Sequence, residues 1–184
     1  MSITYSKPVQ VHQPIPLFEL PDAHGKVWTL GDWADKTVLV VVFTCNHCPY
    51  AQAVRPQLIE LWNEIIREAH SVQFVAINSN DATAYPDDAT DKMMDRQYAY
   101  PFPYLRDETQ EVARDFGAVC TPDIFVFDRN RHLQYRGRIN DNWKEPARAT
   151  SHDLKDAIHA ILRGERPGME QQPSMGCSLK WKES

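Results

Sequence analysis

The chain has 184 residues, of which 42% are hydrophobic, and this size and composition suit one globular domain with a sizeable core. Its formal net charge is −5 with acidic and basic residues interspersed, so we expect no nucleic-acid partner, because such partners need clustered cations. The longest apolar run, Val38 to Phe43, is far below the ~20 residues of a membrane span, which excludes membrane insertion.

The first third of the chain predicts a hairpin, a strand and a helix. Short apolar pieces at 17–20 and 27–30 flank a turn signal at 21–25, which favours a leading β-hairpin. The run Val38 to Phe43 is typical of a buried strand. Apolar residues then recur at helical spacing up to about His70, and Pro56 lies inside this predicted helix, where it should kink it.

A second buried strand is predicted at Val72 to Ile77. Strand, helix and strand in that order imply a right-handed parallel crossover. A polar turn at 78–81 then opens toward an acidic stretch that carries Met93 and Met94, and we expect this stretch to be helical.

The remaining elements are short. Residues 108–116 predict a helix that Gly117 closes. Strands at 124–127 and 133–139, joined by a polar turn, predict an antiparallel hairpin. A last helix is expected from Ser151, as its cap, to Leu162.

Residues 164–184 form a tail that contains proline and glycine. Met175, Leu179 and Trp181 flank Cys177 in this tail, and such apolar anchors favour docking on the body over a loose end. We therefore expect one domain over residues 1–163, including the hairpin, followed by a docked tail at 164–184.

The segment Cys45-Asn46-His47-Cys48 follows directly on the first buried strand and is the main chemical signal. A helix beginning there would offer unpaired N–H groups that favour a thiolate. Two cysteines at this spacing can also be half of a zinc site, which needs a second close pair of ligands. Cys120 and Cys177 are isolated from each other in the sequence, so we favour redox chemistry and expect no metal and no cofactor.

Cysteine usage predicts a cytoplasmic protein. Four cysteines are too few for a disulfide scaffold in a chain of this size. The first eight residues also lack the charged-then-apolar layout of an export signal.

Several motifs carry a family resemblance: the Cys-x-x-Cys at a strand–helix junction, Pro56, the pair Thr121-Pro122 before a strand, and the leading hairpin. Together they resemble the thioredoxin fold in its redoxin form, the branch of the alkyl hydroperoxide reductase/thiol-specific antioxidant proteins. More narrowly, the chain looks like a bacterial peroxiredoxin-like group labelled thioredoxin family protein. The stretches that carry this narrower likeness are 43–50, 78–81, 103–105 with 107–110, 117–123 and 173–181.

The resemblance implies an α/β, thioredoxin-like fold with a central mixed β-sheet flanked by helices. It also implies a cis peptide bond before Pro122, which would face the active-site disulfide. The backbone beside Thr121 would then be free to pair with an extended substrate segment.

For the chemistry, we expect Cys45, as the more exposed sulfur, to attack a disulfide, and Cys48, deeper in the helix, to resolve the mixed disulfide. His47 resembles the histidine of protein disulfide isomerase, which implies that it stabilises the neighbouring thiolate; the alternative is a surface histidine without effect. Thioredoxin has a buried acid in the preceding strand, but residues 38–43 are all apolar here, which leaves solvent or His47 to handle the Cys48 proton.

Two further cysteines are candidates for redox roles. Cys120 precedes Pro122 by two residues and could approach the disulfide, or it could be an ordinary small buried side chain. Cys177 could fold back with the tail as a resolving cysteine, link two chains, or have no role.

The sequence thus favours a thiol-disulfide oxidoreductase that acts on protein or small-molecule disulfides, with a thioredoxin or glutathione system as electron donor. A peroxiredoxin-like peroxidase is the first alternative, although the Pro-x-x-x-Thr-x-x-Cys pattern of that family would place Val41 and Cys45, or Val38 and Val42, at its proline and threonine. A carrier of Cu(I) or another soft metal is the second, with His132 as a distant candidate ligand.

Overall fold

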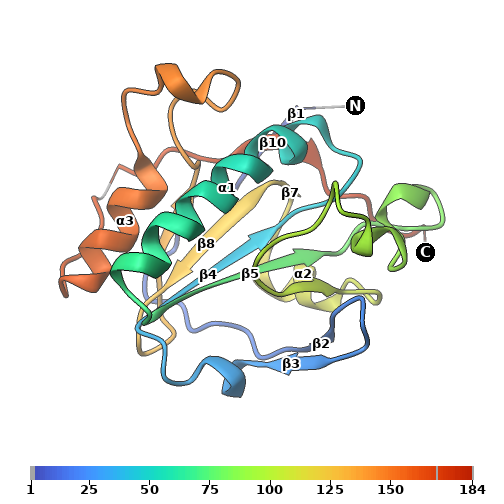
Figure 1. Cartoon of the computed structure of the whole chain (residues 1–184), viewed down its shortest axis with the longest axis horizontal. Helices are drawn as coiled ribbons and strands as arrows, with labels where there is room; N and C mark the ends of the chain where they lie inside the picture. The colour runs from blue at the N-terminus through green and yellow to red at the C-terminus, as the bar shows by residue number, and fades with distance from the viewer. Residues whose placement is uncertain (1–2, 169, 184) are drawn as a thin grey trace.

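A five-stranded mixed sheet forms the centre of the computed structural model, which describes residues 3–168 and 170–183 (Figure 1). The strand order is β6-β5-β4-β8-β9. β5 runs parallel to β4 and β6, whereas β8 is antiparallel to β4 and β9, which confirms the mixed sheet and the parallel crossover. The bounds are Val38–Phe43 for β4, Val72–Asn78 for β5, Tyr104–Arg106 for β6, Asp123–Phe127 for β8 and Leu133–Gly137 for β9.

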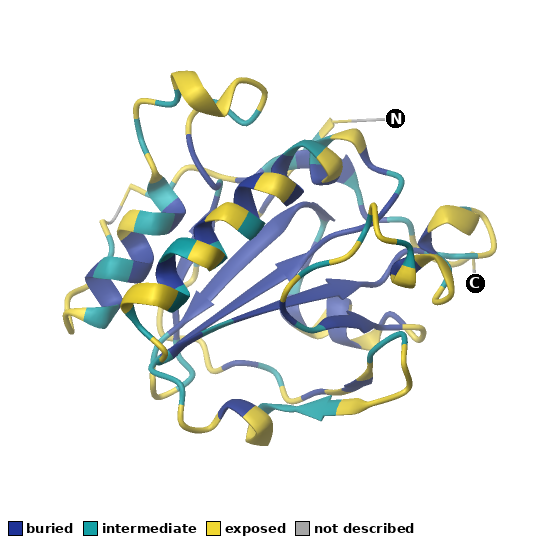
Figure 2. Ribbon diagram, viewed as in Figure 1, coloured by how far each residue is buried: buried dark blue, intermediate teal, exposed yellow. Residues whose placement is uncertain are grey.

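Helices cover both faces of this sheet, which explains why β4 is apolar at every position. Alternate side chains of a strand point to opposite faces. Val40 and its neighbours at even positions pack in one core cluster with α1 (Pro49–Glu68) and α3 (Asp153–Leu162). Val41 and its neighbours at odd positions pack in a second cluster with α2 (Glu111–Phe116). The buried strands between exposed helix faces are visible in Figure 2.

The leading hairpin is confirmed as β2 (Glu19–Pro21) paired with β3 (Val27–Thr29). Its turn is held by Asp22, whose carboxylate accepts N–H bonds from the backbone of His24 and Lys26. A 3-10 turn, η1 (Leu30–Trp33), follows the hairpin. The hairpin and α2 lie on the same face of the sheet, opposite α1 (Figure 1).

A second, three-stranded sheet joins the two ends of the chain. Its order is β1-β10-β7, with β1 at Ile3–Tyr5, β10 at Met175–Ser178 and β7 at Cys120–Thr121. Both pairings of β10 are antiparallel, and Cys177 lies opposite Thr121. The C-terminal tail therefore lies against the loop that precedes Pro122.

The prediction of a helix around Met93 is wrong. The segment instead forms two 3-10 turns, η2 (Pro86–Asp88) and η3 (Lys92–Met94). Proline lacks the N–H that a helix interior needs, and aspartate is a poor helix former, so the local sequence opposes a regular helix. Met93 is nevertheless buried in the first core cluster.

Two helix boundaries also differ from expectation. α2 begins at Glu111 because Gln110 has a left-handed backbone (φ 64°), although Gly117 closes the helix as predicted. Ser151 does not cap α3: the N-cap is His152, and the Ser151 hydroxyl donates to Asp153. A 3-10 turn, η4 (Pro146–Arg148), precedes this helix.

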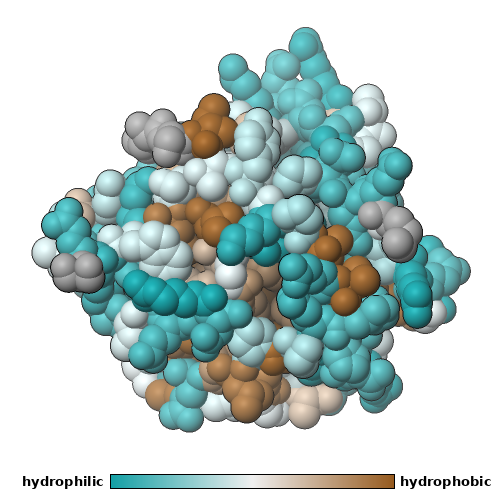
Figure 3. All heavy atoms as spheres, turned by 180° about the vertical axis from the view of Figure 1, so that it is seen from behind, coloured by the Kyte–Doolittle hydropathy of each residue, from teal (hydrophilic) through white to brown (hydrophobic). Residues whose placement is uncertain are grey.

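The surface carries scattered apolar side chains. Seen from behind, the hydrophobic residues form separate small patches among hydrophilic ones (Figure 3). Single exposed apolar residues of this kind are ordinary in folded proteins. Among the described residues, no helix is long and apolar enough to cross a membrane.

Gly176 allows β10 to lie against the loop before Pro122, and replacing it should weaken this contact. A Cβ at position 176 would lie 2.0 Å from the carbonyl oxygen of Thr121, a backbone atom that cannot move away cheaply. We expect Gly176→Ala to lower the free energy of unfolding by roughly 1–3 kcal/mol in urea melts, as overpacking does. Gly168→Ala, where a Cβ would meet nothing within 4 Å, is the matched control. Equal stability of the two variants would contradict this account.

Candidate redox site

Cys45 and Cys48 lie at the carboxyl end of β4, where the chain turns into α1. Cys48 is the N-cap residue of α1, and Cys45 stands before the helix. Both side chains are 0% exposed, so the expectation that Cys45 is the more exposed sulfur is wrong, as is a position of Cys48 deep in the helix. The tail contributes to this burial, because Cys177 of β10 lies in the same small cluster as these two cysteines.

Thr121, on β7, contacts the sulfurs of both Cys45 and Cys48. Its hydroxyl lies 3.3 Å from Cys45 Sγ, and its carbonyl oxygen lies 3.2 Å from Cys48 Sγ. The peptide bond between Thr121 and Pro122 is cis, as the resemblance implies. The structure therefore brings together the four residues Cys45, Cys48, Thr121 and Pro122.

Cys48 is the sulfur that ionises most readily. Hydrogen bonds from the thiol of Cys45, from the thiol of Cys177 and from the backbone N–H of Ala51 outweigh burial and lower the pKa of Cys48 to about 4. The carbonyl oxygen of Thr121 accepts only from the protonated thiol, so this contact works in the opposite direction. The helix N-terminus thus acts on the second cysteine of the motif rather than on the first.

Cys45 keeps its proton. Burial, the hydrogen bond to Cys48 and the negative charge of Asp88 raise the pKa of Cys45 well above its ordinary value. The two pKa shifts act in the same sense, because each favours a thiolate on Cys48 and a proton on Cys45.

Asp88 is a buried acid beside these cysteines that the sequence did not reveal. It is 0% exposed, and its oxygens accept bonds from the backbone N–H of Asn46 and from the side chains of Asn78 and Asn80. Burial alone would raise the pKa of Asp88, but the bond from His47 together with these donors lowers it. Asp88 is therefore held as a buried carboxylate beside the cysteines.

His47 points at Asp88 rather than at a sulfur. Its Nδ1 lies 2.5 Å from Asp88 Oδ2, and its ring stacks on Tyr85 at 4.5 Å between centroids. A ring nitrogen of His47, a carboxylate oxygen of Asp88 and Cys45 Sγ all lie within 4.8 Å of one another. His47 Nε2 is buried and has no hydrogen-bond partner among the described residues. His47 and Asp88 thus form a pair next to the protonated thiol.

The asparagines of this site had a sequence signal that could have been used. Asn78 is the last residue of β5 and Asn80 follows it, and β5 is parallel to β4 and next to it. Carboxyl ends of neighbouring parallel strands meet at one sheet edge, so the polar turn after β5 had to lie near the cysteines. Asp88 lies ten residues farther on, in an irregular segment, and no pattern in the sequence indicates its position.

The backbone beside Thr121 is not free to pair with a substrate, contrary to expectation. β10 occupies that edge of β7, with Cys177 opposite Thr121. Cys177 is 1% exposed and donates its thiol hydrogen bond to Cys48, and burial together with this bond raises the pKa of Cys177 to about 12. The protein's own tail therefore fills the position expected for an extended substrate.

Cys120 is buried next to this site but faces away from the other sulfurs. Adjacent residues of a strand point to opposite sides, so Thr121 and Cys120 cannot both face Cys48. Cys120 Sγ lies 3.5 Å from the carbonyl oxygen of Pro122, and burial raises the pKa of its thiol. This arrangement is that of a small packed side chain.

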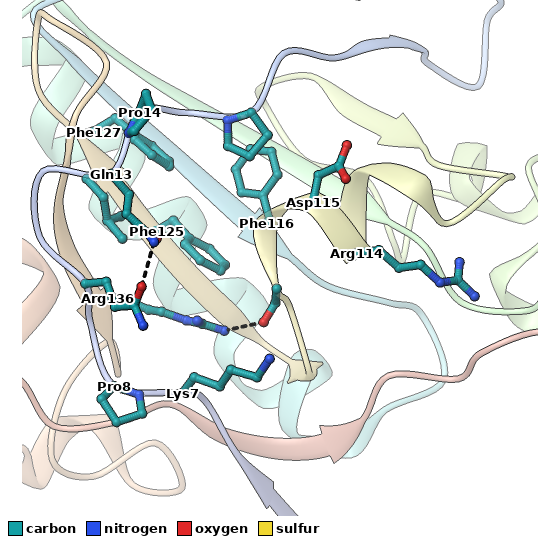
Figure 4. A pocket seen from close by; sticks show the side chains of 14 residues that line it. Lys7, Pro8, Gln13, Pro14, Arg114, Asp115, Phe116, Phe125, Phe127 and Arg136 are labelled. Carbon is teal, nitrogen blue, oxygen red and sulfur yellow. Dashed lines mark hydrogen bonds between the residues drawn. The ribbon is translucent and has the colours of Figure 1, made fainter.

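A separate cavity of about 370 Å³ lies on the other face of the sheet (Figure 4). Its floor is formed by Phe116, Phe125 and Phe127, and Arg136 and Arg114 reach its rim. Both cations have partners: Arg136 donates to Asp123 and to the carbonyl oxygen of Gly117, and Arg114 lies over a tryptophan ring. We therefore assign the chemistry to the cysteine site.

His132 does not join the cysteines. It follows β8 at the end of the sheet away from Cys45, because Asp123 pairs with Phe43 whereas Phe127 pairs with Leu39. A metal site made of the cysteines and His132 is thus ruled out by the strand register.

Residues 11–136 match the AhpC/TSA family. An uncharacterised conserved protein from Geobacillus kaustophilus is 39% identical, with 100% of this chain and 98% of that chain covered and a TM-score of 0.92. A hypothetical protein from Sinorhizobium meliloti is 36% identical, with 98% and 100% covered and a TM-score of 0.89. A putative thiol:disulfide interchange protein DsbE from Chlorobium tepidum, 22% identical over 85% of this chain and 97% of that chain (TM-score 0.59), shares the fold. The curated proteins gave no match.

The ionisation of Cys48 can be followed by the ultraviolet absorbance of thiolate in the reduced protein. We expect one thiolate to persist down to a midpoint near pH 4. Cys45→Ala should move this midpoint upward, because the bond from Cys45 is the largest cause of the shift, and Cys48→Ser should remove the signal. An unchanged titration in Cys48→Ser would show that the charge sits on another sulfur.

Asp88→Asn should make Cys45 ionise more easily. The substitution removes the negative charge that raises the pKa of Cys45, so the second thiolate step should move to lower pH. It should also cost about 1–3 kcal/mol of folding stability, since buried donors lose a charged acceptor. Asp87→Asn, at an exposed neighbour, is the matched control and should change neither quantity.

Proposed function

The chain belongs to the AhpC/TSA family, and on that premise we propose that it is a thiol-disulfide oxidoreductase that cycles Cys45 and Cys48 between dithiol and disulfide through a mixed disulfide. One observation carries the proposal: the thiol of Cys45 is hydrogen-bonded to a Cys48 whose pKa is lowered, against the loop formed by Thr121 and cis-Pro122. A thiolate that touches a second thiol can form a mixed disulfide and then be released from it.

In the first step Cys48 attacks the substrate disulfide. The hydrogen bonds from Cys45, from Cys177 and from the N–H of Ala51 favour its thiolate as the nucleophile, whereas the sequence alone favoured an attack by Cys45. One substrate sulfur becomes bonded to Cys48, and the other leaves as a thiolate that takes up a proton.

In the second step Cys45 attacks Cys48 and releases the substrate. The Cys45–Cys48 bond forms as the mixed disulfide breaks, so the substrate has gained two electrons and the protein holds a disulfide. Cys45 must lose its proton in this step. The pair of His47 and Asp88, within 4.8 Å of Cys45 Sγ, is the group placed to accept it.

The substrate is a disulfide-containing protein or a small disulfide, and a thioredoxin or glutathione system in the cytoplasm returns the oxidised pair to the dithiol. Both sulfurs are 0% exposed, so a substrate reaches them only after a local opening. Small disulfides need a smaller opening than proteins do. Loops and terminal strands with few contacts supply such openings.

A thiol peroxidase is the alternative that the family favours. Its chemistry needs donors that polarise the peroxide next to the thiolate, and the Thr121 hydroxyl is one such donor. The buried Arg55 donates to the backbone carbonyl oxygen of Cys45, not to its sulfur. The site therefore supports disulfide exchange better than peroxide reduction.

Soft-metal binding is a second alternative, favoured by the grouping of Cys45, His47 and Asp88. Both carboxylate oxygens of Asp88, however, are already used. Oδ1 accepts N–H bonds from Asn46 and Asn78, and Oδ2 accepts one from Asn80 and contacts His47. Binding a metal would therefore break buried hydrogen bonds. Metal analysis of protein purified under reducing conditions distinguishes this alternative, because an oxidoreductase of the kind proposed keeps its activity without bound metal.

The proposed function is tested by reduction of insulin disulfides with dithiothreitol as the electron source. We expect catalysis by the wild-type protein and a loss of roughly 100-fold or more in Cys48→Ser and in Cys45→Ser, because each removes a covalent step. Cys120→Ser is the matched control and should stay active, since Cys120 faces away from the site. Full activity of Cys48→Ser, or hydrogen peroxide consumption that far exceeds disulfide reduction, would overturn the proposal.

A further inference from the structure

Cys48 has two sulfur neighbours. Cys45 reaches it from the end of β4, and Cys177 reaches it from β10. All three are buried, with exposures of 0%, 0% and 1%. The proposed function uses only the first of these contacts, so the second needs its own explanation.

The backbone fixes Cys177 in this position from both sides. β10 is the central strand of its sheet, and Cys177 lies opposite Ile3 on β1 and opposite Thr121 on β7. Next to it, Gly176 approaches the Thr121 carbonyl so closely that no side chain would fit. The contact between the sulfurs is therefore imposed by strand register and by a glycine.

Beyond Cys177 the tail is anchored to the polar side of the site. Leu179 donates its N–H to Val119, and the N–H of Lys180 is bound by the side chain of Asn80. Asn80 is also a donor to Asp88. The tail and the carboxylate beside Cys45 consequently belong to one hydrogen-bonded unit.

We propose that Cys177 is a second exchange partner of Cys48, so that the oxidised protein moves its disulfide from Cys45–Cys48 to Cys48–Cys177. The proposal rests on the proposed function, which supplies the first disulfide. Cys177 Sγ attacks Cys48 Sγ, the Cys48–Cys177 bond forms as the Cys45–Cys48 bond breaks, and the electron pair leaves on Cys45. The proton of Cys177 passes to Cys45. One disulfide replaces another, so this step consumes no oxidant or reductant.

The exchange changes what holds β10 in place. In the Cys45–Cys48 form, hydrogen bonds and packing hold this strand on the edge of β7. In the Cys48–Cys177 form, a covalent bond ties it to the start of α1. Because β10 covers the edge at which an extended substrate would pair, the second form is closed to such substrates, while Cys45 is released as a thiol beside His47 and Asp88. The oxidation state of Cys48 thus regulates access to its own site.

The first test is disulfide mapping of Cys45→Ser after oxidation with diamide, with free thiols blocked by N-ethylmaleimide in acid. We expect a monomer with a Cys48–Cys177 bond and with Cys120 blocked as a thiol. Cys45→Ala is a second variant that gives the same expectation without a hydroxyl at the site. Cys48 found blocked as a thiol or in disulfides between chains, with Cys177 blocked as a thiol, would overturn the proposal.

The second test measures whether the bond holds the tail. In oxidised Cys45→Ser, cleavage of the tail by trypsin should be slower than in the reduced form by roughly tenfold or more, because a crosslink suppresses local opening. The matched control is oxidised Cys45→Ser/Cys177→Ser, in which no such protection is expected. Equal cleavage in the oxidised and reduced forms of Cys45→Ser would contradict a tail lock.

The two proposals fail separately. In Cys177→Ser, oxidation should give only the Cys45–Cys48 bond. If that bond forms while Cys45→Ser fails to pair Cys48 with Cys177, the exchange is wrong and the proposed function stands. If wild-type and Cys177→Ser proteins never form the Cys45–Cys48 bond, the proposed function is wrong, whatever Cys177 does.

Discussion

The hydrogen bonds that converge on the sulfur of Cys48 are the interaction on which the site depends. A thiolate out of water is costly unless donors surround it. Here the thiols of Cys45 and Cys177 and the N–H of Ala51 supply them, because Cys48 is the N-cap residue of α1. The same contacts that lower the pKa of Cys48 hold the thiols of Cys45 and Cys177 in hydrogen-bond contact with it. The same arrangement therefore stabilises the thiolate of Cys48 and places its exchange partners beside it.

The fold supplies each part of this arrangement from a different place in the chain. β4 ends at Phe43 and delivers Cys45 and Cys48, the loop with cis-Pro122 delivers the hydroxyl and carbonyl of Thr121, and β10 delivers Cys177. Asp88 completes the site by holding His47 and the backbone of Asn46. None of these segments is adjacent in sequence to all the others, so the folded chain is needed to bring them together.

The sequence predicted what regular patterns encode. An unbroken apolar run marked β4, and the Cys-x-x-Cys at its end located the site because strand and helix meet there. The pairing of β10 with β7 could not be predicted from the sequence. Strands of two to four residues are too short to show a periodic pattern, and only their partners define them. Asp88 was missed for a related reason: tertiary contacts to Asn78 and Asn80, rather than local propensity, set its position. The proposed order of attack differs from the one expected from the sequence because it depends on which cysteine caps the helix, a boundary that sequence patterns locate poorly.

The most direct measurement is a redox titration of the wild-type protein against glutathione buffers, with the partner of every cysteine mapped at each potential. If Cys48 is the shared sulfur, each intramolecular disulfide at every potential contains Cys48, joined to Cys45 or to Cys177, while Cys120 remains a thiol. A disulfide between Cys45 and Cys177, or one that includes Cys120 while Cys48 remains reduced, would contradict the account.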